Sequence, residues 1–350
     1  MFQFRTARLP AALAIVTMAA LSAAGAAVAE DYPELVVTLG TDDNVFNPTT
    51  ASVFQLAGDL GFYDRHQVKV TFIGLDGTPL AAAALQSGAV DVAHITIDSA
   101  IRLAAGNNLP VRGFLSVEAG TPFLIASRAD IATPEDLAGR SFAISDNGGL
   151  DHILTQQVLQ SFGIDPEAPS YVAIGAPSVR VQALAVDQVE ATTVSVGTFA
   201  AVEDTPGLHV LVPPEVFTAR APAQSKFLVA REETLEEKQD ALQRFTDAIM
   251  EASRAFAADP EIWIEAAAAA RPDLNRETIE RIAGYNTRLW CVNGCMQPDA
   301  LQVSMDFIYA NPDFAGVPVI GVEDIVDFSF TDAALAEMGV AEAVGVDSGD

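Results

Sequence analysis

The chain has 350 residues, half of them hydrophobic, and carries 19 lysine and arginine residues against 47 acidic ones, for a net charge of −28 at pH 7. This length suffices for two domains, and acid spread along the whole chain repels phosphate backbones and anionic lipid. We therefore predict a protein with an acidic, solvated surface that binds neither nucleic acid nor a membrane surface.

The first 29 residues have the layout of a cleavable export signal. Two arginines precede an apolar stretch from Leu9 to Ala24, and small residues end at Ala29. This layout predicts a signal peptide cut between Ala29 and Glu30, and hence a periplasmic protein without direct membrane insertion. A transmembrane anchor is the alternative, but the stretch is rich in alanine, and no later segment reaches the ~20 apolar residues that span a bilayer.

Strands and helices alternate in the next part of the chain. Short apolar or alternating segments predict strands at 35–39, 68–72 and 90–95. Helical patterns with glycine stops predict helices at 51–60, 78–88 and 97–105. Strand–helix–strand units of these lengths form largely parallel sheets, which predicts a first α/β lobe.

The same plan returns further along the chain. Strands are predicted at 141–145, 171–174 and 189–194. Helices are predicted at 149–162 and 178–186. These segments predict a second α/β lobe with a parallel sheet of its own.

Two apolar extended runs flank the second lobe, PFLIASR at 122–128 and QSKFLVAR at 224–231. We interpret both as crossings between the lobes that together form a two-strand hinge and return the chain to the first lobe. The predicted domains are a signal peptide at 1–29, lobe one at 30–125 with 226–340, lobe two at 126–225, and a flexible tail at 341–350.

From Glu232 onward the sequence is helical. One segment spaces apolar residues along a single face, at Leu235, Leu242, Phe245, Ile249 and Phe256. Further helices are predicted at 260–270 and 276–288. A stripe of this kind is typical of a helix packed on a core, which predicts a helical C-terminal region covering lobe one.

A helix–strand unit occurs twice, about a hundred residues apart. The first copy is GTPLAAAALQSGAVDVA at 77–93, and the second is GAPSVRVQALAVDQVEAT at 175–192. Each copy opens with Gly-x-Pro, continues through a short helix and ends at an acidic residue beside a strand. A unit repeated at this distance predicts two lobes of similar plan with a cleft between them.

Cys291 and Cys295 are the only cysteines of the chain, on either side of an Asn-Gly turn. In an oxidising compartment this spacing favours a local disulfide. Zinc would need two more ligands, and no histidine is near in the sequence. We predict a disulfide and neither a metal site nor a cofactor.

Four segments resemble one family of binding proteins: AGDLGFYDRHQVKVTF at 57–72, ALQSGAVDVAHIT at 84–96, IATPEDLAGRSFAIS at 131–145 and QALAVDQVEATTVS at 182–195. In this order they resemble the periplasmic substrate-binding proteins of ABC importers, in the NMT1/THI5-like branch that binds sulfonates, taurine and thiamine-pyrimidine precursors. The chain departs from the family pattern at Val186-Asp187-Gln188, where Ser-Gly is usual, and at Asp98, an acid that many relatives lack.

The resemblance implies a fold and a function. The expected fold is the type II periplasmic-binding-protein fold. The expected function is that of a monomeric receptor whose hinge closes on a small organic ligand, an anion or a zwitterion, and delivers it to importer membrane subunits. The alternatives are a receptor for a thiamine-pyrimidine precursor or an aromatic acid, a THI5-like biosynthetic enzyme, and a ligand-sensing domain for a signalling partner.

The ligand site is predicted where strands end and helices begin, because ligands of open α/β sheets bind beyond the carboxyl ends of the strands. Glycine-rich residues before a helix could hold an oxyanion on free N–H groups or could form an ordinary turn. The predicted ligand-binding residues are Thr41, Asp42, Asn44, Phe46, Thr78, Thr96, Asp98, Ser99, Thr121, Asn147, Gly148, Gly149, Arg180, Ser195 and Phe199.

Charge gives two opposite indications about the ligand. Arg180 could hold a carboxylate or sulfonate as a bidentate fork, or could be a solvated helix residue. Asp42, Asp43, Asp98, Asp146 and Asp151 are expected at the same rims. If several of these acids face inward, a ligand bearing an amine or amidine is favoured over a bare anion.

An enzyme is the main rival class. Four scattered histidines and three lysines offer no evident catalytic or cofactor constellation, and neither a Gly-x-Ser-x-Gly elbow nor a phosphate loop occurs in the sequence. Asp151 and His152 are adjacent on a helix and therefore do not face each other. We predict that the protein is not an enzyme.

Overall fold

The computed structural model describes residues 32–40, 46–75, 77–118 and 120–342, together with Gly345 and Asp347. The predicted signal peptide, Thr41, Asp42, Asn44 and most of the predicted tail lie outside the described residues. Among the helices that are described, none is both long and apolar enough to cross a bilayer.

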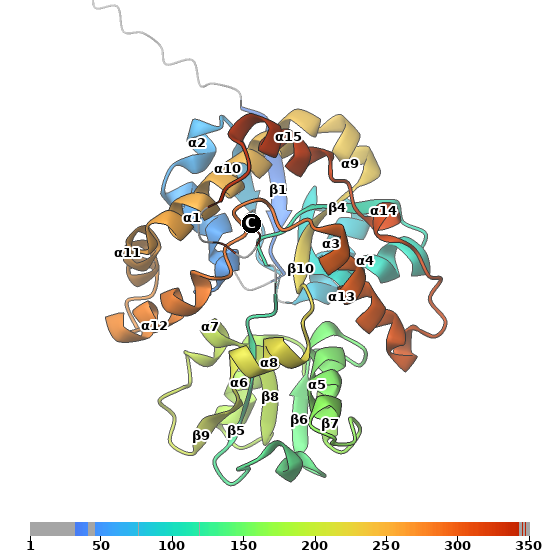
Figure 1. Ribbon diagram of the computed structural model, residues 1–350, viewed down its shortest axis with the longest axis vertical. Helices are drawn as coiled ribbons and strands as arrows, with labels where there is room; N and C mark the ends of the chain where they lie inside the picture. The colour runs from blue at the N-terminus through green and yellow to red at the C-terminus, as the bar shows by residue number, and fades with distance from the viewer. Residues whose placement is uncertain are drawn as a thin grey trace, which may run out of the picture. The chain divides into compact units, whose positions relative to one another are not determined.

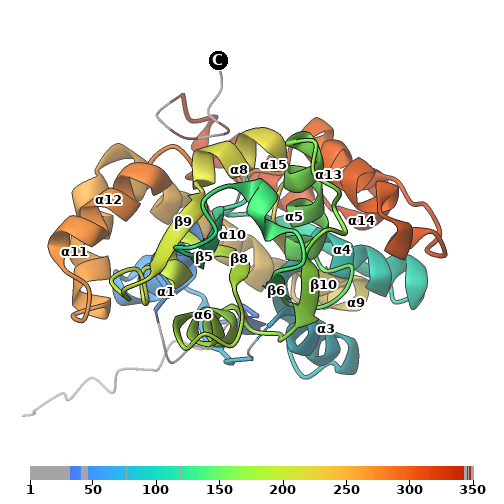
Figure 2. The same ribbon diagram turned by 90° about the horizontal axis from the view of Figure 1, so that it is seen from below.

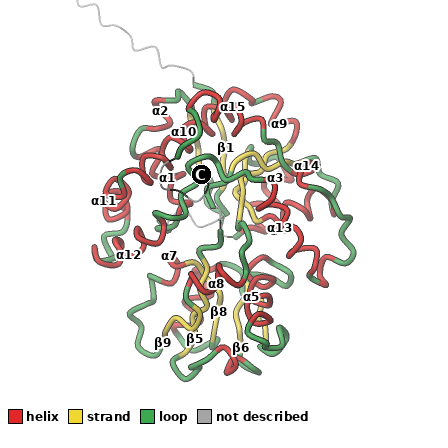
Figure 3. The backbone as a smooth tube through the Cα atoms, in the orientation of Figure 1, coloured by secondary structure: helices red, strands yellow, loops and turns green. Residues whose placement is uncertain are grey.

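Two five-stranded sheets organise the part of the chain from Tyr32 onward (Figures 1 and 3). The first sheet has the order β2 (Lys69–Phe72), β1 (Glu34–Thr38), β3 (Val92–Thr96), β10 (Lys226–Arg231), β4 (Val111–Leu115). The second has the order β7 (Ser170–Ala173), β6 (Ser141–Ile144), β8 (Ala191–Ser195), β5 (Phe123–Arg128), β9 (Leu208–Val212). Position by position, the two orders follow the same plan.

The sheets are mixed rather than parallel throughout. In the first sheet β1 pairs in parallel with β2 and β3, whereas β10 is antiparallel to both of its neighbours. In the second sheet β6 pairs in parallel with β7 and β8, and β5 is antiparallel to β8 and β9. The reversed strands are the two predicted crossings. Each enters its sheet from the other lobe rather than through a βαβ crossover, which explains its direction.

Helices follow the strands much as the sequence predicts. Those around the first sheet in chain order are α1 (Val53–Asp59), α2 (Phe62–Arg65), α3 (Thr78–Ser87), α4 (Ile97–Ile101) and the π-helical η2 (Arg102–Gly106). Those of the second part are α5 (Leu150–Ser161), α6 (Pro177–Ala185), α7 (Val196–Phe199) and α8 (Pro214–Arg220). Single-turn 3₁₀ segments occur at η1 (Thr50–Ser52), η3 (Pro134–Leu137) and η4 (Pro312–Phe314).

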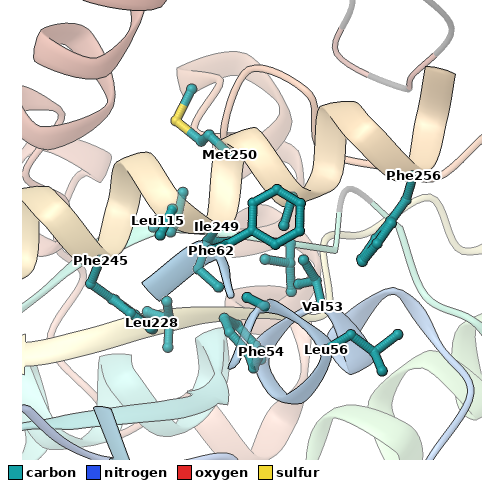
Figure 4. Packing of buried hydrophobic residues seen from close by; sticks show 14 of the residues in the cluster. Val53, Phe54, Leu56, Phe62, Leu115, Leu228, Phe245, Ile249, Met250 and Phe256 are labelled. Carbon is teal, nitrogen blue, oxygen red and sulfur yellow. The ribbon is translucent and has the colours of Figure 1, made fainter. Parts of the chain in front are cut away.

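The C-terminal region is helical, as predicted. It comprises α9 (Glu232–Glu237), α10 (Gln239–Ala258), α11 (Pro260–Ala270), α12 (Arg276–Asn286), α13 (Pro298–Ala310), α14 (Val322–Ile325) and α15 (Ser329–Met338). The predicted apolar face of α9 and α10 is buried at all five positions. Figure 4 shows α10 side chains, including Phe245, Ile249 and Phe256, in the same cluster as residues of α1. The Phe245 and Phe54 rings stack 6.3 Å apart in this core.

The repeated unit forms the same structure twice. Copy one is α3 followed by β3, and copy two is α6 followed by β8. The opening glycines, Gly77 and Gly175, have φ of +100° and +94°, a region that residues with a Cβ avoid, which explains glycine at the start of both copies. Figure 2 shows α3 and α6 along the same side of the molecule. The prediction of two similar lobes is therefore confirmed.

The acid that ends each copy performs the same task. In the first copy Asp91 Oδ2 accepts a hydrogen bond of 2.8 Å from the Val36 N–H of β1. In the second copy Glu190 Oε2 accepts one of 2.9 Å from the Ser141 N–H of β6. Each acid thus satisfies a backbone donor on the neighbouring strand and helps to position the strand pair.

Cys291 and Cys295 form the predicted disulfide. Close to it, Asp347 is buried, and its Oδ2 accepts hydrogen bonds from the N–H groups of Asn293 and Cys295, at 3.0 and 2.7 Å. The predicted domain boundaries stay predictions, although the change from one sheet to the other between β4 and β5, and back at β10, agrees with them.

Candidate ligand-binding site

A cavity of about 340 Å³ lies between the two sheets. Its wall includes the segments that follow β1, β3, β6, β7 and β8, the parallel strands, and the first turns of α3 and α6. Carboxyl ends of strands and helix N-termini therefore converge on it from both lobes, in the position where open α/β sheets bind ligands. Its volume falls in the range of small-molecule pockets.

Seven of the predicted ligand-binding residues line this cavity: Thr78, Thr96, Asp98, Ser99, Gly149, Arg180 and Ser195. Phe123, Asp146 and Asp151, which follow or begin predicted elements near the same rims, lie in the same wall. These residues come from both lobes and are brought together from positions more than a hundred residues apart.

Five predicted residues are not part of the cavity wall. Phe46 and Phe199 are buried in hydrophobic clusters, and Thr121 is buried just before β5. Asn147 is exposed, whereas Gly148 is buried. Packing explains the positions of Phe46 and Phe199, because an aromatic ring next to a strand end can serve a core as well as a pocket.

The glycine-rich turn before α5 uses two of its N–H groups internally. Gly148 N–H donates to His152 Nδ1 at 3.0 Å, and Gly149 N–H donates to the Asp146 carbonyl at 3.2 Å. Gly148 has φ of +72°, so the turn itself requires glycine at this position. These bonds favour the ordinary-turn interpretation over an oxyanion site.

Arg180 is held in a buried network rather than solvated. Its side chain is 4% exposed, and it donates to the carbonyls of Gly175, at 2.5 Å, and Thr193, at 3.1 Å. Arg180 Nη2 also lies 3.4 Å from Asp151 Oδ2. Only Arg180 Nε, which is buried, has no partner among the described residues. The alternative of a solvated Arg180 is wrong.

Asp151 completes this network on the other side. Its carboxylate accepts from the Ser145 N–H at 2.9 Å and from the Ser145 hydroxyl. The Arg180–Asp151 pair therefore connects the ends of β6, β7 and β8, which carry the second lobe's contribution to the cavity. Most of the hydrogen-bonding capacity of the arginine is used for this purpose.

Asp98 presents a buried and incompletely satisfied carboxylate. It is 3% exposed, and its Oδ1 has no hydrogen-bond partner in the part of the chain that is described. Burial raises the pKa of Asp98 to about 6, with Asp146 and Asp151 adding repulsion and Thr96 and Arg102 opposing the shift. The acid that sets this chain apart from the family pattern is therefore part of the cavity.

Three polar residues of the wall were not predicted: His94, Glu118 and Lys226. His94 is 1% exposed, and burial lowers its pKa well below the usual value, so its ring is neutral. Burial raises the pKa of Glu118 and lowers that of Lys226, while the charge of each opposes the shift of the other. A lysine at the start of the apolar crossing run, in a chain with only three lysines, was the available signal.

Contacts between the lobes lie on both sides of the cavity. Asn47 Nδ2 donates to Thr198 Oγ1 at 3.4 Å, and Arg281 Nη2 pairs with Glu203 at 2.5 Å. On the other side Arg102 Nη2 donates to the Gly148 carbonyl at 3.4 Å, and Asn311 Nδ2 donates to Gln156 Oε1 at 2.9 Å. Side-chain contacts therefore join the two lobes on either side of the cavity.

The fold and the cavity between its sheets define a class of protein, the two-lobed α/β proteins with the periplasmic-binding-protein fold. Residues 48–262 match the family described as NMT1/THI5 like. This match spans more than half of the chain, and the protein belongs to that family. No curated protein matches the chain in sequence.

Solved structures agree with this fold at low sequence identity. A ligand-binding component of an ABC-type import system from Staphylococcus aureus, with zinc bound, has a TM-score of 0.68 and 16% identity over 86% of this chain and 99% of its own. The alkanesulfonate-binding protein SsuA from Xanthomonas axonopodis pv. citri, bound to MOPS, has a TM-score of 0.65 and 16% identity over 85% and 98%.

A third solved structure with this fold holds a different ligand. A Cys-to-Ser variant of DszB in complex with biphenyl-2-sulfinic acid has a TM-score of 0.60 and 14% identity, over 87% of this chain and 99% of its own. In the present chain, both cysteines are in the disulfide. The described residues include no group of three or more His, Cys, Asp or Glu side chains able to hold a metal ion.

Proposed function

We propose that this protein is the solute-binding receptor of an ABC importer. In this proposal it is exported to the periplasm, captures a small organic ligand between its lobes and presents the closed form to importer membrane subunits. One observation carries the proposal: a cavity lies at the strand ends of both lobes, with contacts between the lobes on either side of it. Such a cavity is reached by hinge opening and is closed by binding.

A receptor accounts for the cavity better than an enzyme does. Covalent catalysis needs an activated nucleophile next to a base, and both cysteines of the chain are tied up in the disulfide. His94 is neutral, and its Nε2 is buried without a partner among the described residues. The Arg180–Asp151 pair connects strands. We infer that the polar groups of the wall bind and orient a solute rather than transform it.

A screen by thermal shift tests this function. The purified mature chain would be heated with millimolar sulfonates, aromatic acids, pyrimidines and amines. A ligand that binds only the folded protein raises the melting temperature by mass action, by an amount that grows with its concentration. We expect one chemical class to do so.

A pair of variants shows whether the shift comes from the cavity. Thr78 lines the cavity at the start of α3, whereas Ser178 is exposed at the start of α6 and lies outside the wall. Thr78→Trp should abolish the ligand-induced shift by filling space, and Ser178→Trp should keep it. A shift that survives Thr78→Trp, or the absence of a shift with every class, would contradict the proposal.

A further inference from the structure

The charged groups of the cavity wall do not balance. Its carboxylates are Asp98, Glu118, Asp146 and Asp151, and its cations are Arg180 and Lys226. Arg180 and Asp151 pair with each other at 3.4 Å, and His94 is neutral. Three carboxylates therefore remain against one ammonium group, inside a chain whose net charge is already −28. A field of this sign attracts cations and repels anions.

Asp98 is the point at which this excess is least compensated. The Ser99 hydroxyl reaches its Oδ2 only at 3.4 Å, Thr96 is a second hydroxyl that acts on the carboxylate, and Oδ1 has no partner among the described residues. Of the cations whose charge acts on Asp98, Arg102 donates to the Gly148 carbonyl and lies over the Phe314 ring, 4.0 Å from its centre, and Lys226 also interacts with Glu118. A carboxylate that is 97% buried and unpaired gains strongly from a cation that reaches it.

Most of the surface area of the wall is apolar, although eleven of its uncharged side chains carry a hydroxyl or an amide group. Leu39, Pro122, Phe123, Leu150, Pro177 and Val194 contribute to the apolar part. A cavity with apolar walls and a few charged groups selects a ligand with a hydrocarbon or aromatic body and one polar head. An aromatic ring such as Phe123 is also a favourable neighbour for a cation.

We propose that the ligand carries a protonated amine or amidine on a small apolar body, and that Asp98 is the group that recognises its positive charge. This inference rests on the proposed receptor function and names the ligand class for the same cavity. Of the anion or zwitterion that the family resemblance implies, it excludes the bare anion, because the predicted anion-binding group, Arg180, is engaged by Asp151 and by two backbone carbonyls.

Head groups compared on matched bodies test the proposal by titration calorimetry at pH 7.5. One series is benzylamine, benzyl alcohol and phenylmethanesulfonate, and a smaller series is propylamine, propanol and propanesulfonate. A zwitterion, 4-(aminomethyl)benzoate, shows whether Lys226 accepts an anion at the same time. We expect each amine to bind at least about tenfold more tightly than its alcohol and its sulfonate, as one charge-assisted hydrogen bond allows.

Two variants locate the charge that is recognised. Asp98→Asn keeps the shape of the side chain and removes its charge, and it should weaken amine binding at least about tenfold while leaving the alcohol within about twofold. Asp204→Asn makes the same change at an exposed turn outside the cavity and should leave both affinities unchanged.

The outcomes separate this inference from the receptor function. Tighter binding of sulfonates than amines, or amine binding that Asp98→Asn leaves intact, would overturn the inference while leaving a receptor. The wild-type series alone measures whether amines or sulfonates bind more tightly, even if the variant did not fold. If no compound of either series bound, while the thermal-shift screen found another class, the amine assignment would be rejected; if both failed, the receptor proposal would fall with it.

Discussion

Asp98 destabilises the fold at neutral pH, and in our proposal it binds the ligand in the cavity. Burial raises its pKa to about 6 from an ordinary 3.8, so the native state binds the proton more tightly than the unfolded state does. Its contribution to stability is therefore full below about pH 3.8 and is lost as the pH rises to about 6. At neutral pH the ionised carboxylate is a destabilising feature, as is common for groups that bind ligands.

We predict that Asp98→Asn stabilises the ligand-free protein at pH 7.5. The gain should be up to about 3 kcal/mol, since two pKa units correspond to roughly that energy, and should shrink as the pH falls from 6 to 4. Urea unfolding of both proteins at pH 4, 5 and 7.5 measures it. The groups that act on Asp98 through their charge, Asp146, Asp151, Arg102 and Lys226, are present in both proteins and leave the comparison intact. Equal stability at every pH would contradict the prediction.

The site illustrates what single residues reveal in a sequence. Asp98 and Arg180 could be placed at the cavity because they follow predicted strand ends or helix starts. The role of Arg180 could not be predicted, because its partners Asp151, Gly175 and Thr193 meet only when three strands are side by side. Lys226 and Glu118 lie on segments that cross between the sheets. The position of these two residues at the cavity could not be predicted, because periodicity does not show whether such a segment faces a cavity or a core.

At the level of elements, the two copies of the repeat differ at the end of the helix. In copy one the left-handed position after α3 is Gly88, with φ of +75°. In copy two the left-handed residue is Asp187, with φ of +63°, one residue beyond the C-cap Val186. This is one of the two places where the sequence departs from the family pattern, and the expectation that it alters only a helix end agrees with α6 ending at Ala185. A residue with a Cβ in this conformation is strained, aspartate less than most.

Asp187→Gly should therefore stabilise the protein by about 0.5–1 kcal/mol. The carboxylate of Asp187 pairs with Arg128, but its side chain is 65% exposed, and an exposed ion pair contributes little. Thermal unfolding measures the change, with Gly88→Asp as the reciprocal variant, which should destabilise copy one. Loss of stability in Asp187→Gly would mean that the ion pair outweighs the strain.

Elements were predicted well where the chain alternates between strand and helix and less well elsewhere. The predictions agree with the structure for β1, β3, β6 and β8 and for the helices between them. Each strand has an apolar or alternating pattern of its own, and the helices end at glycines. No strand was predicted at β4 or β9, whose only strand neighbours are the crossing strands β10 and β5. A five-residue edge strand whose partner is distant in sequence has little local signal.

At the level of the whole molecule, the two lobes approach each other closely at Gly197. A Cβ at this position would overlap Asn47 Oδ1 and lie 3.1 Å from Pro48 Cδ, both across the interface between the lobes. Gly197 is in α7 and does not line the cavity. A side chain at position 197 would therefore limit how far the lobes close, although it would not itself contact the ligand.

We predict that Gly197→Ala folds normally but favours the open arrangement. Overpacking of this kind costs about 1–3 kcal/mol, which corresponds to roughly 5- to 150-fold weaker ligand binding. Small-angle X-ray scattering with saturating ligand should show a larger radius of gyration than for the wild type. Gly284→Ala, which meets nothing within 4 Å, is the matched control. Unchanged affinity in Gly197→Ala would show that the protein binds its ligand without this close contact between the lobes.

The position of β10 in the first sheet has a consequence for the order in which the molecule can be completed. All strands of the second sheet lie between Phe123 and Val212, whereas the first sheet needs Lys226–Arg231 to join β3 to β4. During synthesis, all strands of the second sheet are therefore made before the first sheet has its full set of strands. The first sheet, which contains the first strand of the described chain, can therefore be completed only after the second.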